Sequence, residues 1–351
     1  MKRIQVGVLG ATGTVGQGFV RLLADHPWFE VAAVAASERS AGKSFGEACR
    51  WRLSAPLPDR VGRLPILPLD PRAMAGIPLV FSALPADVAC RVEPTFVVEG
   101  FVVSSNATSF RQQSDVPLVV PEVNPDHLRL IDLQRRTSGR RGFLVTNPNC
   151  TTTGIALVLK PLHDAFELNS VVAASMQAVS GAGYPGVASL DILDNVIPWI
   201  FGEEEKIETE TRLLLGRVDE RGKVKAELKV SAHANRVSVL DGHTVCLSLG
   251  FRHPCTPRDA IDVLGVFRGA SADLDLPSAP ERPVLVREEE DRPQPRLDRD
   301  AGRGMTVTVG RVRACSVLDL RLALVVHNTV RGAAGGSIEN GELLVRGGWL
   351  P

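Results

Sequence analysis

A cysteine stands where the sequence changes from a short apolar run to an apolar helical pattern. Phe143 to Val145 are apolar, the tripeptide Asn149-Cys150-Thr151 follows, and Ile155 to Leu159 continue as a predicted helix. A cysteine at a helix N-terminus meets unpaired backbone N–H groups and the positive end of the helix dipole, which favour its thiolate. A thiolate is the nucleophile that acyl chemistry requires, so Cys150 is predicted to carry an acyl group.

A glycine-rich loop near the start of the chain predicts a dinucleotide site. The segment Gly10 to Gly16, with the pattern GxxGxxG, follows a predicted strand at Ile4 to Leu9 and opens a predicted helix at Gly13 to Asp25. Glycines permit a tight turn and let backbone N–H groups approach a phosphate. The pattern alone is weak, and a purely structural turn is the alternative, but its place between strand and helix strengthens it. The residues expected to contact the cofactor are Gly10, Thr12, Gly13, Thr14 and Val15.

The residues after the second predicted strand, Phe29 to Ala35, indicate which cofactor binds. NAD enzymes usually place a carboxylate at this strand end, where it holds the ribose 2′-hydroxyl. Here Ser37 takes that place and Arg39 lies close by. A hydroxyl and a guanidinium suit a 2′-phosphate, so the sequence predicts NADP, with Glu38 as the feature that favours NAD instead.

A cysteine nucleophile needs a base and a group that binds its substrate. His243 is the strongest candidate for the base, because an imidazole with a near-neutral pKa can shuttle the proton of a thiohemiacetal. Arg236 precedes it in the same segment. The two residues bracket a predicted strand and turn, so both side chains are expected in one cleft.

The composition is that of an ordinary globular enzyme. The chain has 351 residues, enough for two domains, and is 44% hydrophobic and 23% charged. Its 40 basic and 40 acidic residues cancel, which argues against nucleic-acid or membrane partners. No apolar run approaches the roughly 20 residues of a membrane helix, and the N-terminus lacks a signal-peptide pattern. The six scattered cysteines have no CxxC spacing, so no metal is expected and a cytoplasmic, reduced protein is predicted.

The fold class expected is α/β, with two domains. Residues 1–149 alternate short apolar strands, such as Leu79 to Leu84 and Phe101 to Ser105, with helical stretches; this is typical of a Rossmann-like, doubly wound parallel sheet. Residues 150–326 form a predicted α+β catalytic and dimerisation domain with a mainly antiparallel sheet. Its expected strands are Ser170 to Val179, Val224 to Ala232, Val245 to Phe251 and Met305 to Arg313.

Three further segments complete this prediction. A helix at Leu190 to Ile200 is expected to cover the second sheet. Ala270 to Gly304 is rich in proline and charge and is expected to be a surface excursion, either a solvated loop or a subunit contact. A helix at about 327–351 begins with small residues that permit close packing, and it is expected to return to the first domain.

Seven segments resemble the aspartate-semialdehyde dehydrogenase family, nearest to its archaeal and fungal branch. The resemblance spans nearly the whole chain. It rests on residues 104–107, 115–124, 148–152, 177–183, 202–206, 236–243 and 327–335.

The resemblance implies a reaction. Cys150 attacks the acyl carbon of aspartyl phosphate, phosphate leaves, and a thioester remains. NADPH then delivers hydride, and the thiohemiacetal collapses to aspartate semialdehyde with His243 handling the proton. A homodimer or homotetramer with the second sheet at its interface is also implied.

The resemblance also implies binding roles. Gln177 would position the intermediate, and Arg236 would clamp the substrate α-carboxylate, since a guanidinium fork matches a carboxylate. Glu203 would meet the ammonium, and Lys206, one turn later, the phosphate. The further expected contacts are Arg111 and Asn149 for the substrate and Ser82, Ser180, Gly181 and Asn328 for the cofactor.

Each binding role has a plainer alternative. Gln177 is otherwise a buried amide, Arg236 a surface ion pair, and the acidic run Glu203 to Glu210 a solvated helix face. The family usually has proline where this chain has Ser238, which puts the placement of Arg236 in doubt.

Two other functions compete with this interpretation. Malonyl-CoA reductase has the same cysteine chemistry but needs no ammonium partner, so Glu203 discriminates between the two. A non-catalytic NADP-binding protein would require an inert Cys150.

Overall fold

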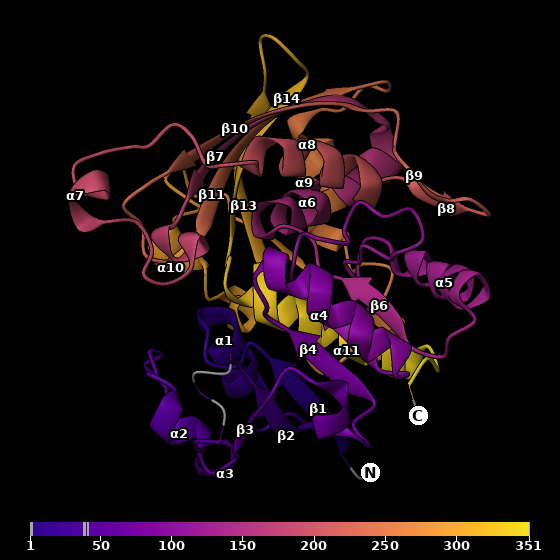
Figure 1. Cartoon of the computed structure of the whole chain (residues 1–351). Helices are drawn as coiled ribbons and strands as arrows, with labels where there is room; N and C mark the ends of the chain where they lie inside the picture. The colour runs from indigo at the N-terminus through magenta and orange to yellow at the C-terminus, as the bar shows by residue number, and fades with distance from the viewer. Residues whose placement is uncertain (1–2, 38–39, 41, 351) are drawn as a thin grey trace.

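The computed structural model describes residues 3–37, 40 and 42–350, which form two six-stranded sheets with helices packed on them (Figure 1). Arg39, predicted to contact the cofactor, lies outside the described residues. No helix in the described ranges is long and apolar enough to cross a membrane.

The first sheet is entirely parallel, with the strand order β3-β2-β1-β4-β5-β6. Its strands are apolar runs buried on both faces, as in doubly wound sheets, and the predicted Rossmann-like class is confirmed. The strand bounds are Ile4–Leu9 (β1), Phe29–Ala35 (β2), Ile66–Leu67 (β3), Leu79–Ser82 (β4), Val102–Ser105 (β5) and Phe143–Thr146 (β6).

Helices cover both faces of this sheet. Phe19 of α1 (Thr14–Leu23) and Ile338 of α11 (Gly335–Arg346) share one apolar cluster with Phe81. Phe96 of α4 (Ala86–Val98) packs in a separate cluster on the other face. The smaller helices are α2 (Phe45–Ala48), α3 (Asp59–Gly62) and α5 (Leu130–Ser138). The C-terminal α11 thus lies against the first sheet, while the domain boundary at residue 149 stays a prediction.

The second sheet has the order β10-β7-β11-β14-β13-β12. Three pairings, β7–β11, β11–β14 and β13–β14, are antiparallel, and two, β10–β7 and β12–β13, are parallel. The bounds are Leu168–Gln177 (β7), Lys229–Arg236 (β10), His243–Phe251 (β11), Val284–Val286 (β12), Val307–Ala314 (β13) and Leu320–Val326 (β14). Helices α6 (Cys150–Phe166), α8 (Glu203–Leu214) and α9 (Pro257–Val266) pack on one face.

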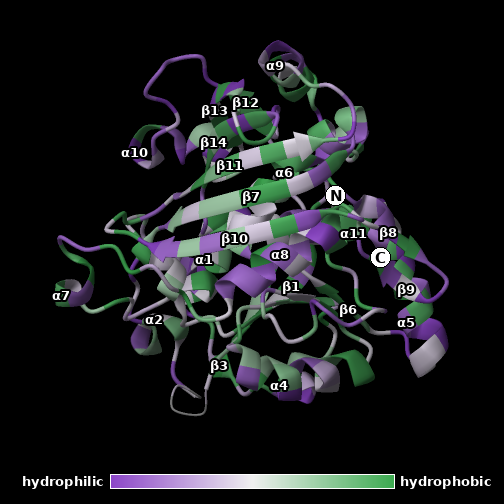
Figure 2. Cartoon of the chain, turned by 90° about the horizontal axis from the view of Figure 1, so that it is seen from above, coloured by the Kyte–Doolittle hydropathy of each residue, from purple (hydrophilic) through white to green (hydrophobic). Residues whose placement is uncertain are grey.

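The other face of this sheet has no helix over it within the described chain. Along β7 the odd-numbered residues from Val171 to Gln177 are buried, while Val172, Ala174 and Met176 are not. The same alternation runs along β11, where Cys246 is exposed between buried Val245 and Leu247. Figure 2 looks onto this face, with β11, β7 and β10 in front of α6 and α8. Such alternation is typical of a sheet that packs on one side only.

The helix predicted at Leu190 to Ile200 is wrong. Only α7 (Ser189–Ile192) is helical, and the chain then extends into a loop in which Ile197 exchanges backbone hydrogen bonds with Arg236. Pro198 disfavours helical geometry at the residue before it, so Ile197 is available for this pairing. The helix that covers the sheet edge is α8 instead.

Two other predictions need correction. The predicted strand Val224 to Ala232 is interrupted, because β9 (Gly222–Val224) closes a hairpin with β8 (Arg217–Asp219) and β10 starts only at Lys229. Between them the N–H of Ala226 donates to the carbonyl of Arg212 on α8. The segment Ala270 to Gly304 is also more than an excursion: it contributes β12 to the sheet and the short α10 (Pro295–Asp298).

Candidate active site

Cys150 is the first residue of α6, and Asn149 caps that helix. The Asn149 side-chain oxygen accepts the N–H groups of Thr151 (2.9 Å) and Thr152 (3.1 Å). Its Nδ2 donates to Oε1 of Glu203 at 2.7 Å. The cap satisfies two N–H groups that the helix itself leaves without partners, and it therefore fixes the turn that carries the cysteine.

His243, at the start of β11, lies beside the cysteine. Its Nε2 is 3.3 Å from the Cys150 Sγ. The backbone N–H of Ala178 donates to the His243 Nδ1 at 3.0 Å. A ring nitrogen that accepts a hydrogen bond carries no proton, so the neutral imidazole has its proton on Nε2, facing the sulfur.

Burial keeps both groups of this pair neutral. It raises the pKa of the Cys150 thiol to about 12, with the Glu203 carboxylate adding to the rise and Arg111 and Thr151 opposing it. Burial also lowers the pKa of His243 to about 3, helped by the charge of Arg236. Burial therefore opposes the effect of the helix N-terminus on the Cys150 thiol, and the predicted thiolate stays a prediction.

A cavity of about 680 Å³ joins Cys150 to the glycine-rich loop. Thr14 and Val15 of the loop line it, as does Cys150. The other predicted site residues in its lining are Arg111, Asn149, Gln177, Ser180, Gly181, Glu203, Lys206, Arg236 and Asn328. The structure thus brings together residues that the sequence separates by more than 300 positions, as in the pair Thr14 and Asn328.

Arg236 ends β10 and is 95% buried, so the interpretation as a surface ion pair is wrong. Its Nη1 donates to the carbonyl of Ala178 at 2.8 Å. A Cβ on Gly181 would lie 2.9 Å from that Nη1, so a larger residue there would displace the guanidinium. The backbone pairing with Ile197 and the Ala178 carbonyl hold Arg236, and this support does not depend on Ser238.

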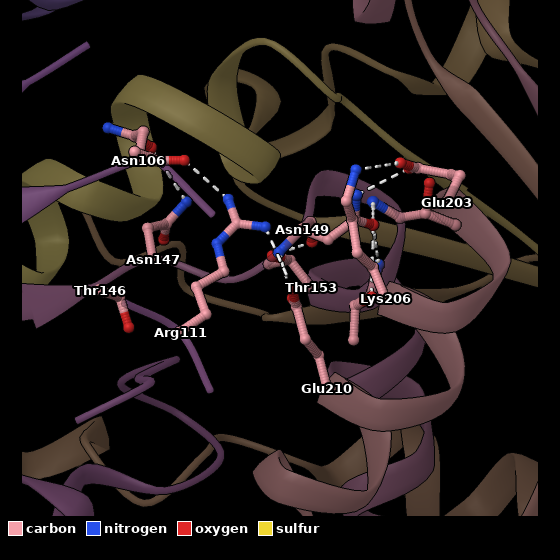
Figure 3. Close-up of polar contacts among 12 residues, drawn as sticks. Asn106, Arg111, Thr146, Asn147, Asn149, Thr153, Glu203, Lys206 and Glu210 are labelled. Carbon is pink, nitrogen blue, oxygen red and sulfur yellow. Dashed lines mark hydrogen bonds and ion pairs between the residues drawn. The ribbon is translucent and has the colours of Figure 1, made fainter. Parts of the chain in front are cut away.

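The acidic run at the start of α8 is not a uniformly solvated face. Glu203 is 6% exposed and pairs with Lys206 at 3.4 Å, and Glu210 is 1% exposed. Glu205 is exposed. Figure 3 shows how Glu203, Lys206 and Glu210 point from one side of the helix toward Asn149 and Arg111. The spacing of three and seven residues places these three on one helix face.

The glycine-rich loop has the shape that a nucleotide phosphate needs. Gly10 has a φ of +74°, and a Cβ on Gly16 would lie 2.2 Å from the Gly10 carbonyl oxygen, so both positions require glycine. Gly13 is the N-cap of α1, and no side chain of the described residues caps that helix. Its first N–H groups therefore remain available to an anion.

The side of the cavity formed by Gly332 and Asn328 is as closely packed as the glycine-rich loop. A Cβ on Gly332 would lie 2.4 Å from the Cβ of Cys150. Asn328 donates from Nδ2 to the Ser180 Oγ at 2.8 Å and accepts the N–H of Gly242 at 2.9 Å. Asn328 thus holds the backbone at Gly242, directly before His243, and the residues present fit a bound dinucleotide.

Some predicted residues do not line the cavity. One is His243, which is fully buried and contacts Cys150 from behind the cavity wall. Ser82 is completely buried at the end of β4, where its carbonyl accepts the N–H of Asn106, a residue that does line it. Gly10, Thr12 and Gly13 shape the loop without reaching the cavity wall, and Ser37 is exposed just after β2.

Sequence reasoning missed Glu210 and Asn106. Glu210 accepts the backbone N–H of Asn149 at 2.6 Å and the Arg111 Nη1 at 3.1 Å. Its position seven residues after Glu203, on the same face of α8, could have indicated that Glu210 also faces the site.

Comparisons with known proteins give one consistent family. A family model described as "Semialdehyde dehydrogenase, NAD binding domain" matches residues 5–131, and one described as "Semialdehyde dehydrogenase, dimerisation domain" matches residues 159–331. The aspartate-semialdehyde dehydrogenase of Archaeoglobus fulgidus is 52% identical over 98% of each chain, and that of Schizosaccharomyces pombe is 46% identical over 99% of each chain.

Two further relatives bear on cofactor and substrate. The crystal structure of aspartate-semialdehyde dehydrogenase with NADP from Candida albicans matches with a TM-score of 0.92 and 41% identity, over 98% of this chain and 99% of that one. The malonyl-CoA reductase (NADP) of Metallosphaera sedula is 39% identical over 99% of each chain.

Glu203→Gln is expected to lower the pKa of the Cys150 thiol, because it removes a negative charge that raises it while an amide oxygen can still accept from Asn149. Iodoacetamide labelling of Cys150 at pH 8, followed by mass spectrometry, should become about three- to tenfold faster. Glu205→Gln removes the same charge from an exposed position of α8 and should leave the rate unchanged. Unchanged or slower labelling in Glu203→Gln would contradict this electrostatic assignment.

Proposed function

Because this chain belongs to the aspartate-semialdehyde dehydrogenase family, we propose that Cys150, in contact with His243, carries the acyl group in that family's reaction. The protein is an oxidoreductase of amino-acid biosynthesis. It catalyses the NADPH-dependent reductive dephosphorylation of L-aspartyl-4-phosphate to L-aspartate-4-semialdehyde. The observation that supports the assignment of Cys150 is the cavity that joins this residue to the glycine-rich loop.

The first step is acyl transfer to sulfur. The Cys150 sulfur forms a bond with the acyl carbon, and the bond from that carbon to the phosphate oxygen breaks. The thiol proton leaves with the departing phosphate, so a neutral thiol and an acyl phosphate give a thioester and hydrogen phosphate. In this scheme the His243 Nδ1 stays bound to the Ala178 N–H and takes no proton. His243 is therefore proposed to act as a hydrogen-bond donor rather than as the base that the sequence predicts.

The second step reduces the thioester. NADPH supplies the hydride when it is bound. As the acyl carbon accepts that electron pair, its oxygen becomes negative, and the His243 Nε2–H beside the sulfur is placed to donate to it. Collapse returns the C–S electron pair to Cys150 and releases the aldehyde, and solvent then reprotonates the sulfur. No general base is needed in this direction.

The charges around the cavity suit an aspartyl substrate. Arg236 is proposed to bind the α-carboxylate, Glu203 the ammonium, and Lys206 with Arg111 the phosphate; Gln177 and Asn149 border the acyl carbon. An ammonium partner is required for an aspartyl group and not for malonyl-CoA. The place of Glu203 in the cavity wall, near Cys150, supports the aspartyl substrate, because a carboxylate there can bind an ammonium group.

The activity itself is tested in the oxidative direction. With aspartate semialdehyde and inorganic phosphate, the purified protein should reduce NADP, and malonyl-CoA should not oxidise NADPH. Cys150→Ala should reduce turnover at least about 10³-fold, because no other group supplies the nucleophile. Its NADP affinity, measured by calorimetry, should stay within about twofold of the wild type.

A matched control for Cys150→Ala is Cys90→Ala, which truncates an exposed cysteine outside the cavity and should keep full activity. Full turnover in Cys150→Ala, or faster turnover of malonyl-CoA than of aspartate semialdehyde, would overturn the assignment.

The cofactor is NADP, and we propose that Ser37 and Arg39 bind its 2′-phosphate. Arg39→Ala should weaken NADP binding by about 10- to 100-fold, because a charge-assisted contact to the phosphate is lost. NAD has no 2′-phosphate, so its affinity should change less than about twofold. Arg140→Ala, at an exposed turn after α5, is the control and should alter neither. An equal loss for both nucleotides would show that Arg39 does not contact the 2′-phosphate.

The protein oligomerises, and we propose a homodimer, or a homotetramer built from such dimers, in which the uncovered face of the second sheet meets its copy. The side chains of that face are short and mostly neutral around Val172, which is 44% exposed. The alternation along β7 and β11 leaves this face without internal partners among the described residues.

Val172→Asp should dissociate this interface, because it would bury a charge between two copies. In sedimentation equilibrium the wild type should show twice the mass of one chain, or four times for a tetramer, and Val172→Asp the mass of one chain. Val98→Asp introduces the same charge at a position of α4 that is 49% exposed, and it should not change the mass. An unchanged mass for Val172→Asp would exclude this face.

A further inference from the structure

Glu210 is a buried carboxylate that accepts hydrogen bonds from two residues of the site but does not line the cavity. It lies in the penultimate turn of α8 and is 1% exposed. Its Oε1 accepts from the Arg111 Nη1 at 3.1 Å, and its Oε2 accepts the backbone N–H of Asn149 at 2.6 Å. Figure 3 shows Glu210 reaching from α8 to both partners.

Both partners of Glu210 border the reacting groups. Asn149 directly precedes Cys150, and its N–H lies outside the hydrogen-bond ladder of α6, so it needs an external acceptor. Arg111 lines the cavity, and its Nη2 donates to the carbonyl of Asn106 at 2.7 Å. One carboxylate therefore holds the peptide before the nucleophile and a guanidinium at the cavity wall.

The main chain of Arg111 has a hydrogen bond of its own. Lys223, on β9, donates from Nζ to the Arg111 carbonyl at 2.6 Å. Burial lowers the pKa of Lys223 to about 8, against the opposing charges of Glu210 and Asp115. Loss of Glu210 would therefore free the guanidinium first, while Lys223 still holds the main chain of Arg111.

We propose that Glu210 is a positioning residue that sets the distance between the phosphate-binding guanidinium of Arg111 and the sulfur of Cys150. The proposal rests on the proposed function, in which Arg111 binds the phosphate that leaves as Cys150 attacks. Those two events occur at opposite ends of one breaking bond, and small displacements of either group reduce the rate strongly. A single carboxylate bound to both elements fixes their separation.

Glu210→Gln tests this proposal with little change in volume. The amide oxygen can keep the Asn149 N–H, but its NH₂ group then faces the Arg111 guanidinium, and two donors cannot pair. The KM for inorganic phosphate in the oxidative assay should rise about tenfold, with the KM for NADP within about twofold of the wild type. Phosphate should also protect Cys150 from iodoacetamide about tenfold less well, a readout that does not require turnover.

Two controls separate positioning from a general structural effect. Glu205→Gln removes the same charge from an exposed position of α8 and should leave both KM values unchanged. In the double variant Arg111→Gln/Glu210→Gln, the phosphate KM should be within about twofold of that of Arg111→Gln alone, since Glu210 acts through Arg111.

The proposal is overturned if Glu210→Gln leaves phosphate binding unchanged, raises the NADP and phosphate KM values equally, or adds its full effect to that of Arg111→Gln. Absence of phosphate-dependent turnover in the wild type would refute the proposed function instead. The comparison of phosphate protection at Cys150 would then still decide the role of Glu210.

Discussion

The capping of α6 by Asn149 is the interaction on which the site depends. Its side-chain oxygen orders the first turn of the helix, its amide group holds Glu203, and its backbone N–H is held by Glu210. An N-cap of this kind contributes about 1 kcal/mol to a helix. Here the same residue also joins α6 to α8, so the placement of Cys150 and of the charges facing it has a common origin.

Close backbone packing supplies the second constraint. Gly332 packs directly on Cys150, and the neighbouring Arg331 is fully buried between Glu122 and Glu339. Arginine paired with two carboxylates resists displacement, because separating a buried ion pair leaves an uncompensated charge. The segment that returns from the second sheet to the first is thereby held against the nucleophile, and the cavity between the two sheets keeps its shape.

The sequence predicts those features that local patterns determine. The parallel strands are apolar runs in the sequence, and residue type and family resemblance single out Cys150 and His243, which the structure places in contact. The features that the sequence did not predict depend on contacts between residues far apart in the chain. Ile197 pairs with Arg236 rather than continuing a helix, and the His243 tautomer depends on the backbone of Ala178, 65 residues away. Glu210 looked like one more acid in a charged run, because burial cannot be deduced from charge alone.

Two opposing effects act on the ionisation of Cys150, and only one of them can be deduced from the local sequence. A helix N-terminus favours a thiolate only through partial charges, whereas full burial removes the hydration of a whole charge. Glu203 adds a second opposing charge. In the proposed function the substrate ammonium binds Glu203, and its positive charge would offset that contribution and lower the pKa of the Cys150 thiol. Recognition of the substrate and activation of the nucleophile are then coupled through one electrostatic interaction rather than through a conformational change.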